Sequence, residues 1–247
     1  MKAFLSALMF LTRIPVPYIS VTDRDWKRSS IHFPFIGLII GGLLYAEATV
    51  LKQVFSPSVS VFFIILTWIW ITGGLHIDGW MDLADGLGSN RSKERMLEIM
   101  KDSRVGAMGV IAAICLIGGK FIAAHDLFQE NLFFVLIVSP LYARLILIGA
   151  IRLWAYRKEG GLGAGLREAI TLPVLLFHFV WIVGITYVML GTKGILLLLS
   201  TIVFGTLFTA SIYRRLQVLT GDCYGAIVEW CEGTSLFLAV AIWRLFS

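Results

Sequence analysis

Gly194-Ile-Leu-Leu-Leu-Leu-Ser-Thr-Ile-Val-Phe-Gly-Thr-Leu-Phe-Thr-Ala-Ser-Ile-Tyr213 is an apolar run without a single charged side chain. A helix of about 20 such residues is long enough to cross a bilayer, and in lipid it satisfies its own backbone polar groups. Six more blocks of this kind occur outward from it, at Phe33–Val54, Val59–Leu75, Ala107–Ala124, Leu132–Trp154, Leu172–Leu190 and Gly225–Phe246. The sequence therefore predicts an all-α, polytopic transmembrane helical bundle of about seven spans.

The composition excludes two broad classes of protein. Hydrophobic residues make up 58% of the chain and charged residues 15%, with a mean hydropathy of +0.84. A soluble fold carries about 25% charged residues, so this chain is not a soluble globular domain. The net charge of +5 does not indicate nucleic acid, because the basic residues lie between the apolar blocks. The three cysteines (Cys115, Cys223 and Cys231) have neither metal-ligand spacing nor the pattern of a disulfide framework.

The basic residues predict the orientation of the bundle. Sixteen of the 21 Lys and Arg residues lie at Arg152 or in segments 1–32, 76–106, 155–171 and 214–224. Cytoplasmic segments of membrane proteins carry such an excess of positive charge. We therefore expect a multi-pass protein of the cytoplasmic membrane with a cytoplasmic N-terminus and an external C-terminus.

The first 32 residues predict an interfacial segment. Phe4, Leu8 and Leu11 fall on one helical face of a short apolar stretch, which favours a helix lying at the membrane surface. No small-residue cleavage site follows this stretch, so we do not expect a cleaved signal peptide. No separate soluble domain is evident, and residues 1–247 are interpreted as a single integral-membrane domain.

The most informative stretch is Thr72–Gly88, within a predicted cytoplasmic loop at 76–106. It holds Asp78, Asp82 and Asp85 at spacings i, i+4 and i+7, which place the three carboxylates on one face if the segment is helical. Carboxylate oxygens at this density suit Mg²⁺, or Mn²⁺, commonly shared with substrate phosphates. The alternative is a solvated acidic helix end at the membrane surface.

A basic stretch follows directly. Its first cations, Arg91, Lys93 and Arg95, are also what membrane topology alone would supply, and a short amphipathic helix is expected over 92–100. Arg104 stands in a polar, turn-rich segment, which favours a function in binding. Guanidinium groups beside a carboxylate-bound metal are typical of a pyrophosphate site.

Two further segments belong to the same predicted side. Residues 157–165 form a basic, glycine-rich loop, for which a plain connection between helices is the alternative. Asp222 leads into the last span, which carries Glu229 and Glu232 one turn apart. Carboxylates inside a span are functional or paired. We expect a polar pocket with the aspartates at its rim and Glu229 on its wall, with pairing of Glu232 to Arg144 as the alternative.

Five motifs in order carry a resemblance. They are Gly73-Gly-Leu-His-Ile-Asp-Gly79, Asp82-Leu-Ala-Asp-Gly86, Asp102-Ser-Arg-Val-Gly106, Glu159-Gly-Gly-Leu-Gly163 and Thr220-Gly-Asp-Cys-Tyr-Gly-Ala226 with Glu229 and Glu232. The combination resembles the cobalamin synthase family, whose enzymatic name is adenosylcobinamide-GDP ribazoletransferase. The match runs from about residue 5 to residue 235. One departure is the extra glycine after Glu159, which leaves the register around Gly160 open.

The resemblance implies a Mg²⁺-dependent transferase. Adenosylcobinamide-GDP and α-ribazole, or its 5′-phosphate, would give adenosylcobalamin, or its 5′-phosphate, and GMP. The ribose 3′-hydroxyl would attack, with Asp85, Asp102 or His76, in that order, as the base. The implied metal ligands are Asp78, Asp82 and Asp85, the implied catalytic residues Asp82, Asp85, Asp102 and His76. The implied substrate-binding residues are Arg104, Gly106, Arg157, Gly161, Gly163, Asp222, Glu229 and Glu232.

Two other functions stay open at this point. Asp82-Leu-Ala-Asp85-Gly86 also resembles the start of the CDP-alcohol phosphotransferase motif, although the later paired aspartates are absent at the expected spacing. A secondary transporter could use Glu229, Glu232 and Arg144. A transporter places its ionisable residues near the bilayer midplane at a repeat interface, whereas most of the residues here lie in a loop. Membrane lipid is an expected partner, nucleic acid is not, and a homo-oligomer stays open.

Overall fold

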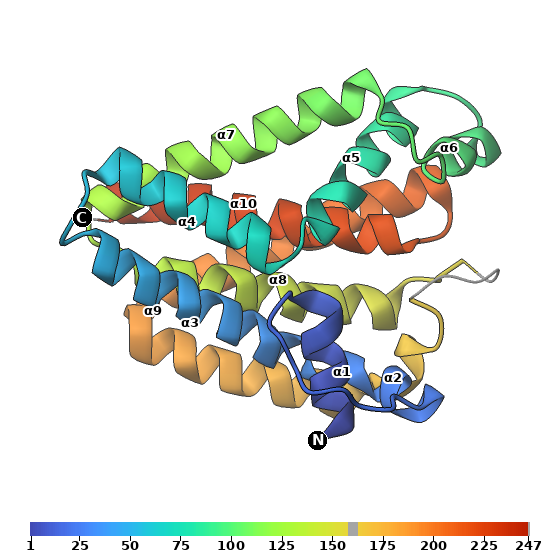
Figure 1. Ribbon diagram of the computed structural model, residues 1–247, viewed down its shortest axis with the longest axis horizontal. Coiled ribbons are helices and arrows are strands. Elements are labelled where there is room, and N and C mark those ends of the chain that lie inside the picture. The colour runs from blue at the N-terminus through green and yellow to red at the C-terminus, as the bar shows by residue number, and fades with distance from the viewer. Residues whose placement is uncertain (158–162, 247) are drawn as a thin grey trace.

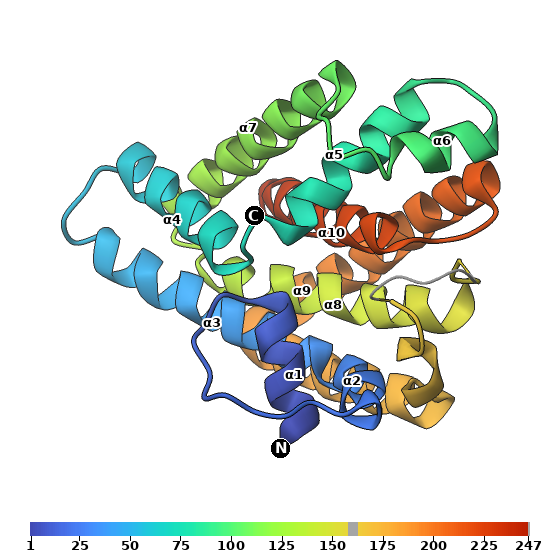
Figure 2. The same ribbon diagram turned by 45° about the vertical axis from the view of Figure 1, so that its right-hand side comes forward.

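The computed structural model describes residues 1–157 and 163–246, and the chain is mostly helical over these residues (Figures 1 and 2). The elements in chain order are α1 (Lys2–Leu11), α2 (Asp23–Ser29), η1 (Ser30–His32), α3 (Phe33–Leu51), α4 (Pro57–Ile71), α5 (Leu75–Gly88), α6 (Lys93–Ile99), α7 (Ala107–Gln129), α8 (Phe134–Leu153), η2 (Leu166–Ala169), α9 (Leu172–Leu216) and α10 (Gly221–Leu245). The fold class predicted from the sequence, a helical membrane bundle, is confirmed.

Five helical segments of the described chain are long and apolar enough to cross a membrane. They are Asp23–Leu51, α7, α8, α9 and α10. The predicted span Val59–Leu75 is shorter than expected, because α4 has 15 residues and ends at Ile71. At 1.5 Å per residue α4 is about 22 Å long, less than the roughly 30 Å of a hydrocarbon core. It would make a further crossing only together with α5, from which it is bent by 86°.

Helix α9 consists of two helices. Its 45 residues are interrupted at Gly191, whose φ of 61° and ψ of −149° are not helical. A Cβ on Gly194 would lie 3.1 Å from the carbonyl oxygen of Thr186, although a straight helix separates residues eight apart by about 12 Å. The chain therefore folds back at Gly191 (Figure 1), within the break that the sequence predicts between Leu190 and Gly194.

Helix α8 lies at the centre of the bundle, among α3, α9 and α10 (Figures 1 and 2). Almost all of its residues are buried, and its closest neighbour is α3. Gly37 and Gly41 of α3 face the α8 backbone, since a Cβ on Gly37 would lie 2.6 Å from the carbonyl oxygen of Pro140. Small residues four apart allow two membrane helices to approach this closely.

The chain changes direction sharply between α4 and α5. Gly73 and Gly74 both have positive φ, 65° and 72°, a conformation that glycine adopts without steric cost. The N–H of Arg13 donates to the carbonyl of Ile71 at 2.7 Å, and the Arg13 side chain lies where a Cβ on Gly73 would be. Residues after α1 therefore hold the bend, and α5 leaves α4 to pack along α10.

The interpretation of 76–106 as a loop is wrong. This segment forms α5, α6 and the start of α7, because the aspartate-rich stretch has an amphipathic pattern with buried His76, Gly79, Leu83 and Gly86. The short helix expected over 92–100 is present as α6. At about 21 Å, α5 alone is too short to cross a bilayer, and it continues the partial crossing of α4 toward the end that carries α6 (Figure 1). We place the aspartate-bearing part of α5 at that end, outside the hydrocarbon core.

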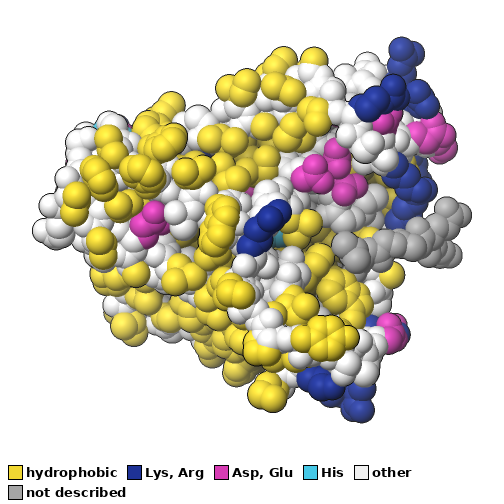
Figure 3. Space-filling model, viewed as in Figure 1, with side chains coloured by type: hydrophobic (Ala, Val, Ile, Leu, Met, Phe, Trp, Pro, Cys, Tyr) yellow, Lys and Arg dark blue, Asp and Glu magenta, His cyan; other side chains and the backbone are white. Residues whose placement is uncertain are grey.

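Charged and apolar side chains separate along the bundle. Figure 3 shows hydrophobic side chains over the left and middle of one face, and Lys and Arg mostly toward the right-hand end. Figure 1 places α2 and α6 at that end. The segments 1–32 and 76–106, which the sequence assigns to one side, therefore lie at the same end of the molecule.

Candidate active site

The candidate site begins at the contact between α5 and α10. A Cβ on Gly79 of α5 would lie 2.6 Å from the carbonyl oxygen of Asp222 and 2.9 Å from its Cα. A Cβ on Gly225 of α10 would lie 3.2 Å from the Cα of His76. The two glycines let the helix backbones touch, and this contact brings Asp222 against the acidic face of α5.

Asp78, Asp82 and Asp222 form an acidic cluster at this contact. Within residues 1–157 and 163–246, none of them makes an ion pair with Lys or Arg. Burial is the main reason that the pKa of Asp82 is raised to about 7. The negative charges of Asp78, Asp222 and Asp85 add to the rise. The cluster is thus an uncompensated concentration of negative charge, which a cation would relieve.

Asp85 has a different environment from the other aspartates. Its Oδ2 accepts a hydrogen bond from the N–H of Gly106 at 2.8 Å, and its Oδ1 accepts one from the N–H of Gly109 at 2.7 Å. The carboxylate therefore caps the first turn of α7, a common position for an acidic side chain. A Cβ on Gly106 would collide with this carboxylate, which explains the glycine there.

No three Asp, Glu, His or Cys side chains in the described part of the chain converge closely enough to form a metal site by themselves. The predicted set of Asp78, Asp82 and Asp85 is therefore not a preformed three-carboxylate site. Mg²⁺ is commonly held by one or two carboxylates together with substrate phosphates and water, so a pair of these aspartates has the chemistry that such a site needs.

A narrow cavity of about 110 Å³ opens beside Asp78 and Asp222. Its lining comes from α1, α3, α5, α8, η2 and α10 and comprises Phe10, Leu11, Phe33, Leu75, His76, Asp78, Leu147, Ile151, Gly163, Leu166, Gly221, Asp222, Tyr224 and Gly225. Pockets for whole small-molecule ligands are about 300–1,000 Å³, so this cavity has room for one part of a larger substrate.

Two tyrosines at this cavity were not singled out from the sequence. The ring of Tyr224, in the lining, stacks on that of Tyr156, with centroids 5.6 Å apart and an interplanar angle of 25°. The Tyr156 hydroxyl accepts a hydrogen bond from the N–H of Gly163 at 3.2 Å. Gly163, predicted to bind substrate, thus lines the cavity and positions Tyr156. Only the place of Tyr224 inside the Thr220–Ala226 motif could have pointed to this pair.

Among the described residues, the predicted site residues between α6 and α7 and in the 157–165 segment do not line the cavity, apart from Gly163. Asp102 accepts hydrogen bonds from the Arg104 side chain at 2.5–3.1 Å, and these hold the pKa of its carboxyl at about 2. Asp102 is therefore a weak base at neutral pH. The Arg157 N–H donates to the carbonyl of Leu219 at 3.0 Å. Gly161, the other predicted binding residue in this loop, lies outside the described residues.

Of the three predicted bases, His76 alone lines the cavity. It is buried, and its Nε2 has no hydrogen-bond partner among the described residues. Asp85 is engaged by α7 and Asp102 by Arg104, so the order Asp85, Asp102, His76 is not supported by the contacts.

The prediction that Glu229 lies on the wall of this cavity is wrong. Lys120 of α7 pairs with Glu229 at 2.5 Å and with Glu232 at 2.7 Å, and Arg144 of α8 also pairs with Glu232. All four side chains are buried, and neither glutamate is in the lining. Carboxylates in a span require a counter-charge, and here two cations from neighbouring helices supply it. The alternative of pairing with Arg144 is confirmed for Glu232, and Lys120, to which the sequence assigned no role, joins the network.

Removal of Lys120 alone should destabilise the bundle. Lys120→Met leaves Glu229 buried without its cation, and we expect the unfolding free energy to fall by about 3–5 kcal/mol. In Lys120→Met/Glu229→Gln both charges are gone while Arg144 and Glu232 still pair, so most of the loss should be recovered. Unfolding in mixed detergent micelles measures both variants. A double variant as unstable as the single one would contradict the pairing.

Known proteins that match this chain show which family it belongs to. The family model described as cobalamin-5-phosphate synthase matches residues 3–240. The chain belongs to this family. A protein of Brevibacillus brevis named adenosylcobinamide-GDP ribazoletransferase is 39% identical over 99% of this chain and 100% of its own length. A protein of the same name from Desulfitobacterium hafniense is 36% identical over 94% of each chain. No solved structure matches.

Membership of the cobalamin-5-phosphate synthase family confirms the resemblance drawn from the five motifs. It also decides against the transporter and the CDP-alcohol phosphotransferase. The motifs around Asp78, Asp82 and Asp222 meet at the α5–α10 contact, although more than 130 residues separate the first from the last.

Proposed function

We propose that this chain catalyses the reaction for which its relatives are named. Adenosylcobinamide-GDP reacts with α-ribazole, or its 5′-phosphate, to give adenosylcobalamin, or its 5′-phosphate, and GMP. The observation that carries the assignment to a site is the cluster of Asp78, Asp82 and Asp222 beside a cavity. These three carboxylates have no cationic partner among residues 1–157 and 163–246. In this reaction the cobinamide phosphoryl group passes from the pyrophosphate of the donor to the ribose 3′-hydroxyl of α-ribazole, and GMP leaves. Such a transfer requires charge neutralisation and positioning.

Magnesium fits this donor set. A pair of the carboxylates of Asp78, Asp82 and Asp222 would supply hard oxygen donors, together with substrate phosphate and water. Burial is the main reason that the pKa of Asp82 is raised, and the neighbouring negative charges add a repulsion that a divalent cation would relieve. Asp85, which the sequence also suggests as a metal ligand, already accepts hydrogen bonds from two backbone N–H groups at the start of α7. Bound there, Mg²⁺ would neutralise charge on the phosphoryl group and on the GMP that leaves.

The protein's own groups would position the two substrates. The Tyr156–Tyr224 pair offers an aromatic face beside Asp222, on which a flat base can stack. Arg13 is exposed next to the α4–α5 bend, two residues after Leu11 of the cavity lining, where a guanidinium can bind phosphate. Most of the large cobinamide substrate would lie outside the cavity.

Product analysis tests the activity. Purified protein in nanodiscs is incubated with adenosylcobinamide-GDP and α-ribazole, with and without Mg²⁺, and the nucleotide and corrinoid products are separated by chromatography. We expect GMP and a complete cobamide in equal amounts. Release of CMP from CDP-diacylglycerol, with no GMP from adenosylcobinamide-GDP, would favour a phosphotransferase acting on a lipid alcohol.

We also propose that the acidic cluster faces the cytoplasm, in the cytoplasmic membrane. The support is the predicted positive-inside bias and the gathering of basic side chains at the end that carries α2 and α6 (Figure 3). Topology reporters fused after Asn90 and after Phe246 should report opposite sides, with Asn90 inside. The same side for both positions would contradict the orientation and remove one crossing.

A further inference from the structure

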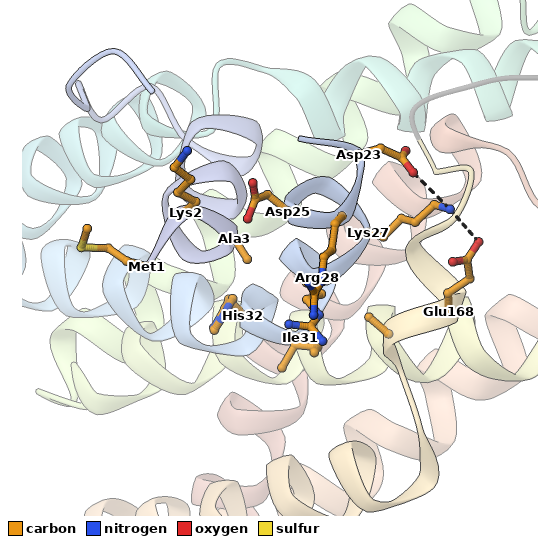
Figure 4. Close-up of a pocket in the computed structure, with 12 residues that line it drawn as sticks. Met1, Lys2, Ala3, Asp23, Asp25, Lys27, Arg28, Ile31, His32 and Glu168 are labelled. Carbon is orange, nitrogen blue, oxygen red and sulfur yellow. Dashed lines mark ion pairs between the residues drawn. The ribbon is translucent and has the colours of Figure 1, made fainter. Parts of the chain in front are cut away.

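A cavity larger than the one beside the aspartates lies elsewhere in the described part of the chain. It measures about 800 Å³ and lies among α1, α2, η1 and η2, at the end of the bundle that also carries α6 (Figures 1 and 4). Its lining consists of Met1, Lys2, Ala3, Asp23, Arg24, Asp25, Lys27, Arg28, Ile31, His32, Glu168 and Ala169. We call this cavity the amino-terminal basic pocket.

The carboxylates of the amino-terminal basic pocket are already engaged. Lys27 bridges Asp23 at 3.2 Å and Glu168 at 3.1 Å, as the dashed lines of Figure 4 mark. Asp25 accepts hydrogen bonds from the N–H of Thr22 at 3.2 Å and from its hydroxyl at 2.6 Å. The Asp25 N–H donates to the Thr22 hydroxyl at 3.2 Å, which completes the capping box of α2. Two of the acidic side chains are therefore paired with Lys27, and the third caps α2.

Two arginines of the pocket have no such partner. Arg24 and Arg28 are exposed, and neither makes an ion pair within residues 1–157 and 163–246. Figure 4 shows Arg28 in the middle of the lining, beside Ile31 and His32. Lys2 donates only to the carbonyl and hydroxyl oxygens of Ser20, at 3.3 Å. The pocket therefore has a surplus of positive charge and free guanidinium donors.

The surroundings of the pocket are those of a membrane surface. Trp26 of α2 packs edge-on against Phe10 of α1, with ring centroids 4.9 Å apart. Tyr18 is 97% exposed, and Met9 and Val21 are exposed as well. Aromatic and apolar side chains beside basic ones are typical of segments that lie at the headgroup level of a bilayer.

We propose that the amino-terminal basic pocket binds the phosphate of an anionic glycerophospholipid. Arg24 and Arg28 offer paired N–H donors to the phosphodiester oxygens, a geometry that guanidinium groups favour. Ala3 and Ile31 supply apolar lining next to these donors, where a headgroup continues into its acyl chains. A soluble phosphate would use the arginines but gain nothing from the apolar surroundings. The bound lipid would tie α1, α2 and η2 to the membrane, independently of the transfer reaction.

A lipid titration tests this site. Native mass spectrometry of the detergent-solubilised protein measures binding of phosphatidylglycerol and of phosphatidylcholine to wild type and to Arg24→Gln/Arg28→Gln. We expect one tightly bound phosphatidylglycerol on wild type and about tenfold weaker binding to the variant. The thermal midpoint of the variant in phosphatidylcholine nanodiscs should equal that of wild type, because neither arginine contributes an ion pair to the fold.

The matched control is Arg214→Gln/Arg215→Gln, which removes two arginines from the end of α9. It should bind phosphatidylglycerol within about twofold of wild type. Equal weakening in both double variants would mean general attraction to charge and would overturn the site. Wild-type affinity of Arg24→Gln/Arg28→Gln for phosphatidylglycerol would also overturn the site. Displacement of the lipid by inorganic phosphate at equal concentration would make the pocket a site for soluble phosphate and would overturn the lipid assignment.

Discussion

Asp82→Asn should lower turnover by about 10²–10³-fold, the scale on which removal of one charge-stabilising group acts. Asp82 lies between Asp78 and Asp85 on the face of α5 that meets Asp222. Its pKa is raised mainly by burial and further by the negative charges of these neighbours. Asparagine keeps the volume but removes the charge that would hold a cation. Because no ion pair or helix cap among the described residues depends on Asp82, the protein should stay folded and should even gain slightly in stability.

The control for this variant is Asp126→Asn. Asp126 lies near the C-terminal end of α7 and pairs with Arg244 at 2.7 Å. It is not part of the acidic cluster and does not line the cavity beside it. Its turnover should stay within about twofold of wild type, since an exposed ion pair contributes little. Turnover of Asp82→Asn close to that of wild type at saturating Mg²⁺ would remove Asp82 from the metal site.

Gly79→Ala should lower turnover by about 10²-fold or more. The added methyl group would lie 2.6 Å from the carbonyl oxygen of Asp222 and 2.9 Å from its Cα, so α5 and α10 must separate. Both contacts are with backbone atoms, which cannot rotate out of the way. A displacement of about 1 Å between catalytic groups can cost 10²-fold in rate. The thermal midpoint should also fall, because the contact is buried.

Gly184→Ala is the matched control for the Gly79 variant. Gly184 is also a helical glycine, in α9. Apart from its chain neighbours and its own helix backbone, no heavy atom of the described residues lies within 4 Å of the position that its Cβ would take. Alanine there should leave turnover unchanged and stability equal or slightly higher, as alanine favours helix over glycine by about 1 kcal/mol. If Gly79→Ala keeps full turnover, the closeness of α5 and α10 is not needed for the reaction.

The helical membrane fold was predictable because a long apolar run in lipid can satisfy its backbone polar groups only as a helix or in a closed barrel. The break before Gly194 and the helix around 92–100 were predictable for the same kind of reason, since glycine and polar residues interrupt a local pattern. The bend at Gly73 and Gly74 was not. It needs two positive φ values in succession and the support of Arg13, a residue about 60 positions away in the sequence.

Partnerships between helices were the least predictable feature. Spacing places Asp82 and Asp85 on one face of α5, yet it does not say that Asp85 meets the first turn of α7. In the same way, the spacing of Glu229 and Glu232 indicates a need for positive charge without naming Lys120, which lies on α7. Helical periodicity determines which residues share a face, and packing between helices determines what that face contacts.

We propose that the reaction takes place at the α5–α10 cluster, not at the buried charges deeper in α10. One measurement compares the two most directly: GMP formed per enzyme in a single turnover by Asp222→Asn and by Lys120→Met/Glu229→Gln. We expect at least about a hundredfold loss of GMP in Asp222→Asn. The double variant should form near-normal amounts of GMP per folded protein. Normal GMP from Asp222→Asn, with none from a folded double variant, would contradict this proposal.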